Sequence, residues 1–235
     1  MMRFFTFWLL STVLVIAPFS AGAFDVDLDD AVETLSEHGP EDAEIQDARF
    51  VRFVPGADPQ LVIEFAEEDQ FGNPREALHV FDYAPAHPQD WAPISEFPYF
   101  TFGTCDTHKA DSGRDVLLCV TADIGMGYLT TVASAIGLFD GEIQRVSIET
   151  YSDPTAGGSI VEDHTFDIAR ITDIESRVDG ETFVVDVAVD RAVAEMPRKY
   201  ERNVADAIND GWQPPETAGE VERFRLTEDR FVPVE

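Results

Sequence analysis

Basic residues are scarce in this chain. Of its 235 residues only 16 are lysine or arginine, whereas 46 are aspartate or glutamate, so the formal net charge is −30. A surface that binds DNA, RNA or an anionic membrane needs clustered basic side chains, and this composition excludes such partners. Hydrophobic residues still make up 44% of the chain and include 18 phenylalanines, so we expect a folded domain rather than an acidic disordered tail.

The short motifs of the familiar enzyme classes are also missing. The chain has no G-x-S-x-G elbow, no H-E-x-x-H helix, no C-x-x-C pair and no glycine-rich phosphate loop. We therefore expect no cofactor and no metal ion, and we favour a function other than catalysis. One enzyme class stays open, because a glycosidase-like hydrolase needs only two carboxylates that the fold brings together.

The first 23 positions have the composition of an export signal. Arg3 precedes an apolar run from Phe4 to Ala17, and small residues end in Ala21-Gly22-Ala23, which is typical of a cleavage site. An uncleaved membrane anchor is the alternative, but a span needs about 20 apolar residues. We predict a cleavable signal peptide over residues 1–23 and a single β-rich domain over residues 24–235. That domain would be periplasmic or extracellular, with no stable membrane insertion after cleavage.

Cys105 and Cys119 are the only cysteines. In an exported protein an even number of cysteines indicates a disulfide, and this one would join a strand at 99–102 to a strand at 115–118 across a polar turn. The same two cysteines and His108 could instead supply three zinc ligands. Only the Cys-x-x-His spacing is short enough for such a site, so we favour the disulfide.

Short runs of aromatic and β-branched residues recur from residue 48 onward. The runs at 49–53, 60–65 and 77–83 are separated by proline and glycine turn signals, which predicts an antiparallel meander. A last hairpin is predicted within 221–234. The fold class is therefore mainly β: an antiparallel sheet, sandwich or barrel-like domain built from hairpins, with a short helix near each end of the mature chain.

Two Asp-Gly pairs, at 140–141 and 179–180, lie between longer alternating runs and predict β-hairpins, because both turn positions tolerate a positive φ. In the first hairpin, residues 129–138 are small enough to satisfy a strand or a helix. In the second, one strand face is apolar and the other is acidic, which predicts one buried and one solvated face. The apolar positions are Phe183, Val185, Val187 and Val189, and the acidic ones are Asp186 and Asp190.

Two segments show helical spacing. Residues 31–38 follow Asp30, which with Glu33 resembles a capping box, and residues 197–211 repeat apolar positions every four residues before Asp210 and Gly211. Just before the first helix, Asp25-x-Asp27-x-Asp29 invites a calcium interpretation. The glycine and the bidentate glutamate of a calcium loop are absent, so a solvated helix start is favoured.

Histidine is suited to proton transfer and to metal binding. The chain has five candidates for these roles: His38, His79, His87, His108 and His164. His79 alternates with apolar residues on one strand face, so we expect a packed or rim histidine. The others lie in polar segments or near a helix end, and no pattern assigns any of them a catalytic role.

The segment from Phe81 to Phe102 has the most distinctive composition. It holds seven aromatic residues, and its prolines keep the first part extended. Rings on a stiff loop form a binding surface at low entropic cost, although such a loop also seals the open end of a sheet. If the segment binds a ligand, the expected site residues are His87, Asp90, Trp91, Phe97 and Tyr99.

The leading hypothesis is an exported, non-catalytic binding or accessory module of the cell envelope. Its partner would be a small ligand or an envelope protein. The first alternative is an envelope hydrolase that uses a carboxylate pair, or histidine with aspartate, and that requires a pocket with a desolvated carboxyl group. The second alternative is a calcium-stabilised structural module, which chelation would destabilise.

Overall fold

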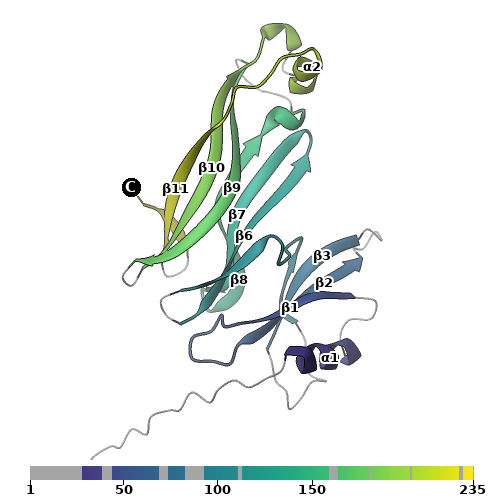
Figure 1. Cartoon of the computed structure of the whole chain (residues 1–235), viewed down its shortest axis with the longest axis vertical. Coiled ribbons are helices and arrows are strands. Elements are labelled where there is room, and N and C mark those ends of the chain that lie inside the picture. Colours follow the sequence, from purple (N-terminus) through teal and green to yellow (C-terminus); the bar gives the residue numbers. More distant parts are fainter. Residues whose placement is uncertain are drawn as a thin grey trace, which may run out of the picture.

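The computed structural model of the chain describes residues 28–38, 44–68, 74–82, 93–110, 113–158, 164–179, 182–201, 203–227 and 230–234. Within these ranges the protein is mainly β, as predicted, with three four-stranded antiparallel sheets and two α-helices (Figure 1). The predicted signal peptide at residues 1–23 lies outside the described residues. No helix in the described part of the chain is long and apolar enough to cross a membrane.

Sheet 1 is a meander whose strands follow one another in chain order. They are β1 (Glu44–Val51), β2 (Gln60–Glu68), β3 (Pro74–Phe81) and β4 (Pro93–Pro98). The first three confirm the predicted meander. Helix α1 (Leu28–His38) covers one face, where Ala31 and Leu35 share a buried cluster with Leu61, Phe65 and Phe81.

Helix α1 begins three residues before the predicted start. Asp30 therefore lies in the first helical turn with Asp29 and is not the N-cap residue, so the capping-box prediction was wrong. Both carboxylates lie near the positive end of the helix dipole, which favours them. Asp25 and Asp27 of the considered calcium motif lie outside the described residues.

Sheet 2 consists of β5 (Cys105–Lys109), β6 (Asp115–Gly125), β7 (Tyr128–Phe139) and β8 (Glu142–Asp153), in that order. The hairpin between β7 and β8 turns at Asp140 and Gly141, whose φ angles are 50° and 81°. This is the positive-φ turn that the Asp-Gly pair predicts. The segment 129–138, left open between strand and helix, is a strand.

The predicted disulfide is formed, and the predicted strand at 115–118 is part of β6, but the strand on the Cys105 side differs from the prediction. Cys105 and Cys119 lie directly opposite each other on β5 and β6, with Cα atoms 4.0 Å apart. Residues 99–102 form no strand, because Phe100 and Phe102 turn into the core between sheets 1 and 2. Strand β5 instead runs through the segment predicted as a turn. With both sulfurs bonded to each other, the zinc interpretation is excluded.

Sheet 3 contains the second predicted long hairpin and the predicted last hairpin. In the long hairpin Asp179 is still part of β9 and pairs with Thr182, so it does not occupy the predicted turn position. Its strands are β9 (Thr165–Asp179), β10 (Thr182–Glu195), β11 (Ala218–Leu226) and β12 (Phe231–Pro233), in the order β12-β11-β10-β9. The predicted apolar face of β10 is buried. On the other face Asp186 is not merely solvated as predicted, because it forms ion pairs with Arg177 on β9 and Arg223 on β11.

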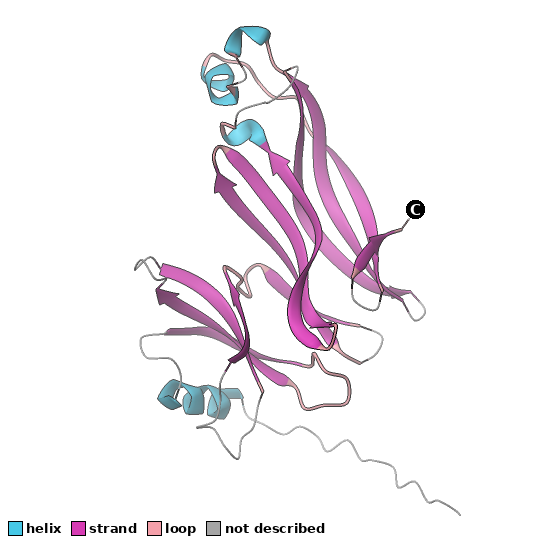
Figure 2. Cartoon of the chain, turned by 180° about the vertical axis from the view of Figure 1, so that it is seen from behind, coloured by secondary structure: helices cyan, strands magenta, loops and turns pink. Residues whose placement is uncertain are grey.

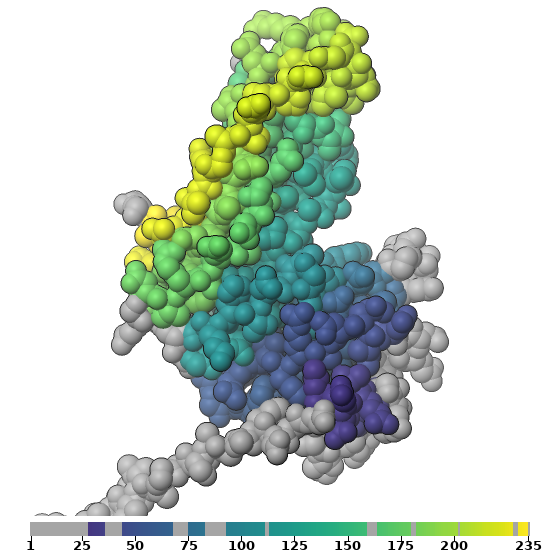
Figure 3. All heavy atoms as spheres, in the orientation of Figure 1, coloured from purple at the N-terminus to yellow at the C-terminus, as the bar shows by residue number. Residues whose placement is uncertain are grey.

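Sheet 2 is the central layer. Along β6 the side chains alternate: Val116 and Leu118 pack against sheet 3, and Leu117 and Cys119 pack against sheet 1. The two sheets on either side are seen in Figure 2, and Figure 3 shows the N-terminal layer in purple and blue at one end and the C-terminal layer in green and yellow at the other. Strands buried on both faces read as continuous apolar runs, as Val116–Cys119 does.

The helix predicted over 197–211 is interrupted. A short 3-10 turn, η3 (Arg198–Tyr200), is followed by Glu201 with φ of 43°, and helix α2 spans only Val204–Asn209. The Asn203 side chain accepts a hydrogen bond from the Asp206 N–H and caps α2. A second 3-10 turn, η2 (Pro154–Ala156), packs beside α2. The predicted helix end at Asp210 and Gly211 is confirmed.

Candidate functional site

Only two of the five predicted site residues lie within the described ranges. His87, Asp90 and Trp91 fall outside them. Phe97 on β4 is 8% exposed and belongs to the core between sheets 1 and 2, so its ring offers little surface to a ligand. Tyr99, one residue beyond the end of β4, is 68% exposed. The aromatic segment therefore both seals the core and projects one ring outward.

Tyr99 has a left-handed backbone conformation with φ of 67°. A large aromatic residue in this region is unusual and is strained by roughly 1–2 kcal/mol, since its Cβ approaches the following carbonyl. Its N–H still donates to the carbonyl oxygen of Glu76 on β3, at 2.8 Å, so the turn starts within the sheet. This turn directs Tyr99 outward while Phe100 enters the core at 4% exposed.

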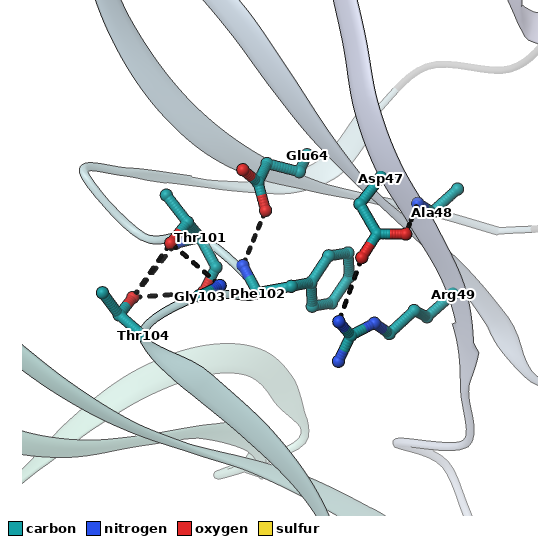
Figure 4. Close-up of polar contacts among 8 residues, drawn as sticks. All are labelled: Asp47, Ala48, Arg49, Glu64, Thr101, Phe102, Gly103 and Thr104. Carbon is teal, nitrogen blue, oxygen red and sulfur yellow. Dashed lines mark hydrogen bonds and ion pairs between the residues drawn. The ribbon is translucent and has the colours of Figure 1, made fainter.

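Hydrogen bonds hold the loop that follows Tyr99 (Figure 4). The buried Glu64 carboxylate accepts the Phe102 N–H at 2.7 Å. The Thr101 hydroxyl accepts the Gly103 N–H at 3.1 Å, and the Thr104 N–H donates to the Thr101 carbonyl at 3.1 Å. Because its backbone groups are satisfied within the loop and by sheet 1, the loop presents Tyr99 in a fixed position.

A cation lies over each of the two buried rings that follow Tyr99. The Arg49 guanidinium is 4.0 Å from the Phe102 ring centroid, and the Arg145 guanidinium is 5.4 Å from that of Phe100. Such contacts contribute about 0.5–1 kcal/mol each at partly exposed sites. They hold the segment between sheets 1 and 2.

A cavity of about 680 Å³ lies on one side of Tyr99. Strand β4 ends beside this cavity, whereas strands β6 and β7 of sheet 2 continue past that point. The polar residues of β6 and β7 are therefore left uncovered there. Cross-strand partners from these two strands line it, together with the ring of Tyr99 and the side chain of Arg145. The strand residues are Thr121, Asp123, Thr130 and Val132.

Tyr99 also lines a second cavity of about 370 Å³, together with Ala66, Arg75, Glu76 and Thr101. Tyr99 is thus the wall that the two cavities share. Each cavity also contains one arginine and one carboxylate, in a protein where basic residues are few. Both offer hydrogen-bond donors and acceptors beside an exposed aromatic face.

The larger cavity offers groups that can bind a ligand through hydrogen bonds and ring stacking. Its described lining holds hydroxyl groups, one guanidinium, one carboxylate and an aromatic ring, but no histidine, no cysteine and no second carboxylate. Acid–base hydrolysis of glycosides needs two carboxyl groups in one site. Among the residues described, the arrangement lacks the second group.

Asp47 and Glu64 are two carboxylate residues that face each other as cross-strand partners on β1 and β2. Each is already engaged. Glu64 accepts the Phe102 N–H, and Asp47 accepts the Ala48 N–H at 2.7 Å and pairs with Arg49 at 3.0 Å (Figure 4). Neither lines the cavities beside Tyr99. Their role in this geometry is structural.

His108 on β5 forms a hydrogen bond with Ser176 on β9, with 2.7 Å between Nδ1 and the serine oxygen. Burial lowers the pKa of this imidazole below its ordinary value, and the nearby Asp106 carboxylate opposes the shift. The pair resembles a nucleophile with its base, but it lines neither cavity beside Tyr99. It connects sheets 2 and 3.

Sequence reasoning missed most residues that line the larger cavity. Thr121 and Asp123 on β6, and Thr130 and Val132 on β7, share one face through the period-two alternation of each strand. The alternation can be predicted from the sequence. The point at which sheet 1 ends and leaves this face of sheet 2 uncovered cannot. Arg145 has no local signal at all. Comparison of the chain with protein-family models, curated proteins and solved structures finds no match.

Proposed function

We propose that this protein is an exported, non-catalytic binding module of the cell envelope that holds a small ligand in the cavities beside Tyr99. The observation that carries the proposal is the exposed Tyr99 ring between two cavities, on a strained backbone that a rigid loop supports. Strain of this kind persists at binding sites, where a fixed side chain is worth more than local stability.

The chemistry of the lining favours a saccharide as the ligand class. A sugar ring has an apolar face that stacks on an aromatic side chain and hydroxyl groups around its edge that donate and accept hydrogen bonds. Tyr99 supplies the ring, Thr121 and Thr130 supply hydroxyl groups, and Asp123 and Arg145 supply an acceptor and a donor. A volume of about 680 Å³ is within the range of ligand sites and accommodates a short oligosaccharide.

Three features support the proposed location in the cell envelope. The first 23 residues have the composition of an export signal. The Cys105–Cys119 disulfide is of the kind that persists in oxidising compartments. A net charge of −30 keeps a protein dispersed in a saline exterior, where ions screen its self-repulsion.

Saturation-transfer NMR with a panel of neutral and acidic oligosaccharides tests the proposal on the mature protein. We expect saturation to be transferred from the protein to the sugar-ring protons of at least one saccharide. Tyr99→Gly should weaken the binding of that saccharide at least tenfold. Arg145→Gln should weaken it by a smaller factor. Met126→Ser is the matched control, because Met126 is fully exposed and lines neither cavity.

Two results would contradict the proposal. One is a panel in which no saccharide binds the wild-type protein. The other is a saccharide that binds wild type and Tyr99→Gly equally well, since its site would then lie elsewhere. Short peptides in the same experiment report on the competing class of ligand: a peptide signal that depends on Tyr99 would keep the site and replace the saccharide.

A further inference from the structure

The face of sheet 1 that carries α1 ends in a polar cluster of Glu67 on β2, His79 on β3 and Glu96 on β4. Each contributes one potential ligand atom, and these three atoms lie within 4.8 Å of one another. His79 is the cross-strand partner of Glu96. None of these three residues lines the cavities beside Tyr99, although Arg75, which pairs with both glutamates, also lines the smaller cavity.

His79 is the unusual member of the cluster. The residue is 4% exposed, and its ring lies 5.0 Å from that of Phe65 and 6.4 Å from that of Phe81. This confirms the expected packed histidine. Yet neither ring nitrogen has a hydrogen-bond partner among the described residues, and Nε2 lies 3.7 Å from the Glu67 Oε1 atom. An unsatisfied buried polar atom costs about 1–3 kcal/mol, so a ligand on Nε2 would remove a penalty.

A cation already lies between the two carboxylates. The Arg75 Nη2 atom is 2.8 Å from Glu67 Oε1 and 2.9 Å from Glu96 Oε1. The position is therefore one where positive charge is favoured. Arg75 is the second residue of β3, and its side chain is 24% exposed, so the guanidinium borders solvent.

We propose that Glu67, His79 and Glu96 form a binding site for a divalent transition metal, and that Arg75 competes with the metal for the two carboxylates. Nitrogen and oxygen ligands at about 2.0–2.1 Å from a tetrahedral zinc ion lie roughly 3.4 Å apart. The 3.7 Å between His79 and Glu67 is close to this value. The remaining adjustment falls on Glu96, whose side chain is 42% exposed on an edge strand.

The ligand set selects the class of ion. Imidazole nitrogen favours zinc and its first-row neighbours over calcium and magnesium, which prefer oxygen alone. Three protein ligands leave a fourth position for water, an arrangement also seen in open zinc sites. We therefore expect zinc and cobalt to bind and calcium to bind much more weakly at this position.

The test is a calorimetric titration of the mature protein with Zn²⁺. One ion per chain is expected to bind above the background of the acidic surface. Arg75→Met, which keeps the apolar stem and removes the competing charge, should tighten binding at least tenfold. Glu96→Gln should weaken it at least tenfold, and because the Glu96 side chain is 42% exposed on an edge strand, this variant should fold normally.

Glu44→Gln is the matched control, because it removes one exposed carboxylate from the same sheet without touching the cluster. It should leave the affinity unchanged. Binding of Co²⁺ gives a second readout, since imidazole coordination alters the visible absorption of the ion, and His79→Gln should abolish that change.

The proposal is overturned by any of three outcomes. Glu96→Gln and Glu44→Gln could weaken zinc binding equally, which would indicate only a diffuse anionic surface. Arg75→Met could leave the affinity unchanged or lower it, which would make Arg75 a structural cation. Zinc could also bind the Arg75→Met variant alone, in which case the native protein has no metal site.

Discussion

Removing the Cys105–Cys119 disulfide is the perturbation with the best-defined consequence. The two cysteines are 14 positions apart, so the bond closes a loop of about 15 residues. In the chain-entropy account, opening such a loop in the unfolded state destabilises the fold by roughly 3 kcal/mol. For a domain of this size, each kcal/mol lowers the melting temperature by about 2–4 °C, so a decrease of about 6–12 °C is expected.

The structure adds a cost beyond chain entropy. Cys105 is 2% exposed and Cys119 is fully buried, and both belong to the core between sheets 1 and 2. Replacing both with alanine removes two buried sulfur atoms and leaves small voids, which add roughly 1 kcal/mol each. Reduced wild-type protein keeps the sulfur atoms, so comparing it with the double alanine variant separates the cross-link from the packing.

Urea unfolding and calorimetry of oxidised, reduced and double-alanine protein provide the measurement. Because the sulfurs are buried, we expect reduction to require denaturant or long incubation, and mass spectrometry after alkylation confirms the thiol state. If fully reduced protein unfolds at the same urea concentration as oxidised protein, the reasoning about loop closure is wrong. Rapid reduction of the native protein by dilute thiol would refute the placement of the bond in the core.

Three further substitutions test the contacts of Asp186, His108 and Tyr99. Hydrogen bonds from Arg223 and Arg177 lower the pKa of Asp186. Asp186→Asn should therefore lower the free energy of unfolding by about 1 kcal/mol at neutral pH. In denaturation assays the difference in stability between wild type and variant should vanish as pH falls below 3.8. Burial lowers the pKa of His108, so the neutral imidazole stabilises the fold fully above pH 6.5 and this stabilisation is lost on acidification. His108→Asn should therefore reduce the decrease in melting temperature between pH 7 and pH 5. An unchanged slope would contradict this reasoning. Tyr99→Gly should be about 1 kcal/mol more stable than Tyr99→Ala, because glycine adopts the positive φ without strain, and equal melting temperatures would refute the strain.

Local signals determined much of the strand arrangement. The Asp-Gly pairs predicted that both long hairpins form. A tight hairpin turn needs two residues that tolerate positive φ, and Asp140 and Gly141 adopt those angles, whereas Asp179 stays in strand β9. The alternation of Phe183 and Val185 with Asp186 predicted which face of β10 is buried, since successive side chains point to opposite faces. The cysteine pair was predicted from number and context alone.

Tertiary structure decided what these rules leave open. Residues 99–102 have the composition of a strand, but the core between sheets 1 and 2 takes up Phe100 and Phe102 and forces Tyr99 outward. Segment 197–211 has helical spacing, yet only six of its residues remain in α2. Hydrophobic spacing specifies which side of an element is buried, but not which distant layer buries it. The Tyr99 cavities and the Glu67–His79–Glu96 cluster exist only because separate strands end or meet there, and no stretch of sequence encodes that by itself.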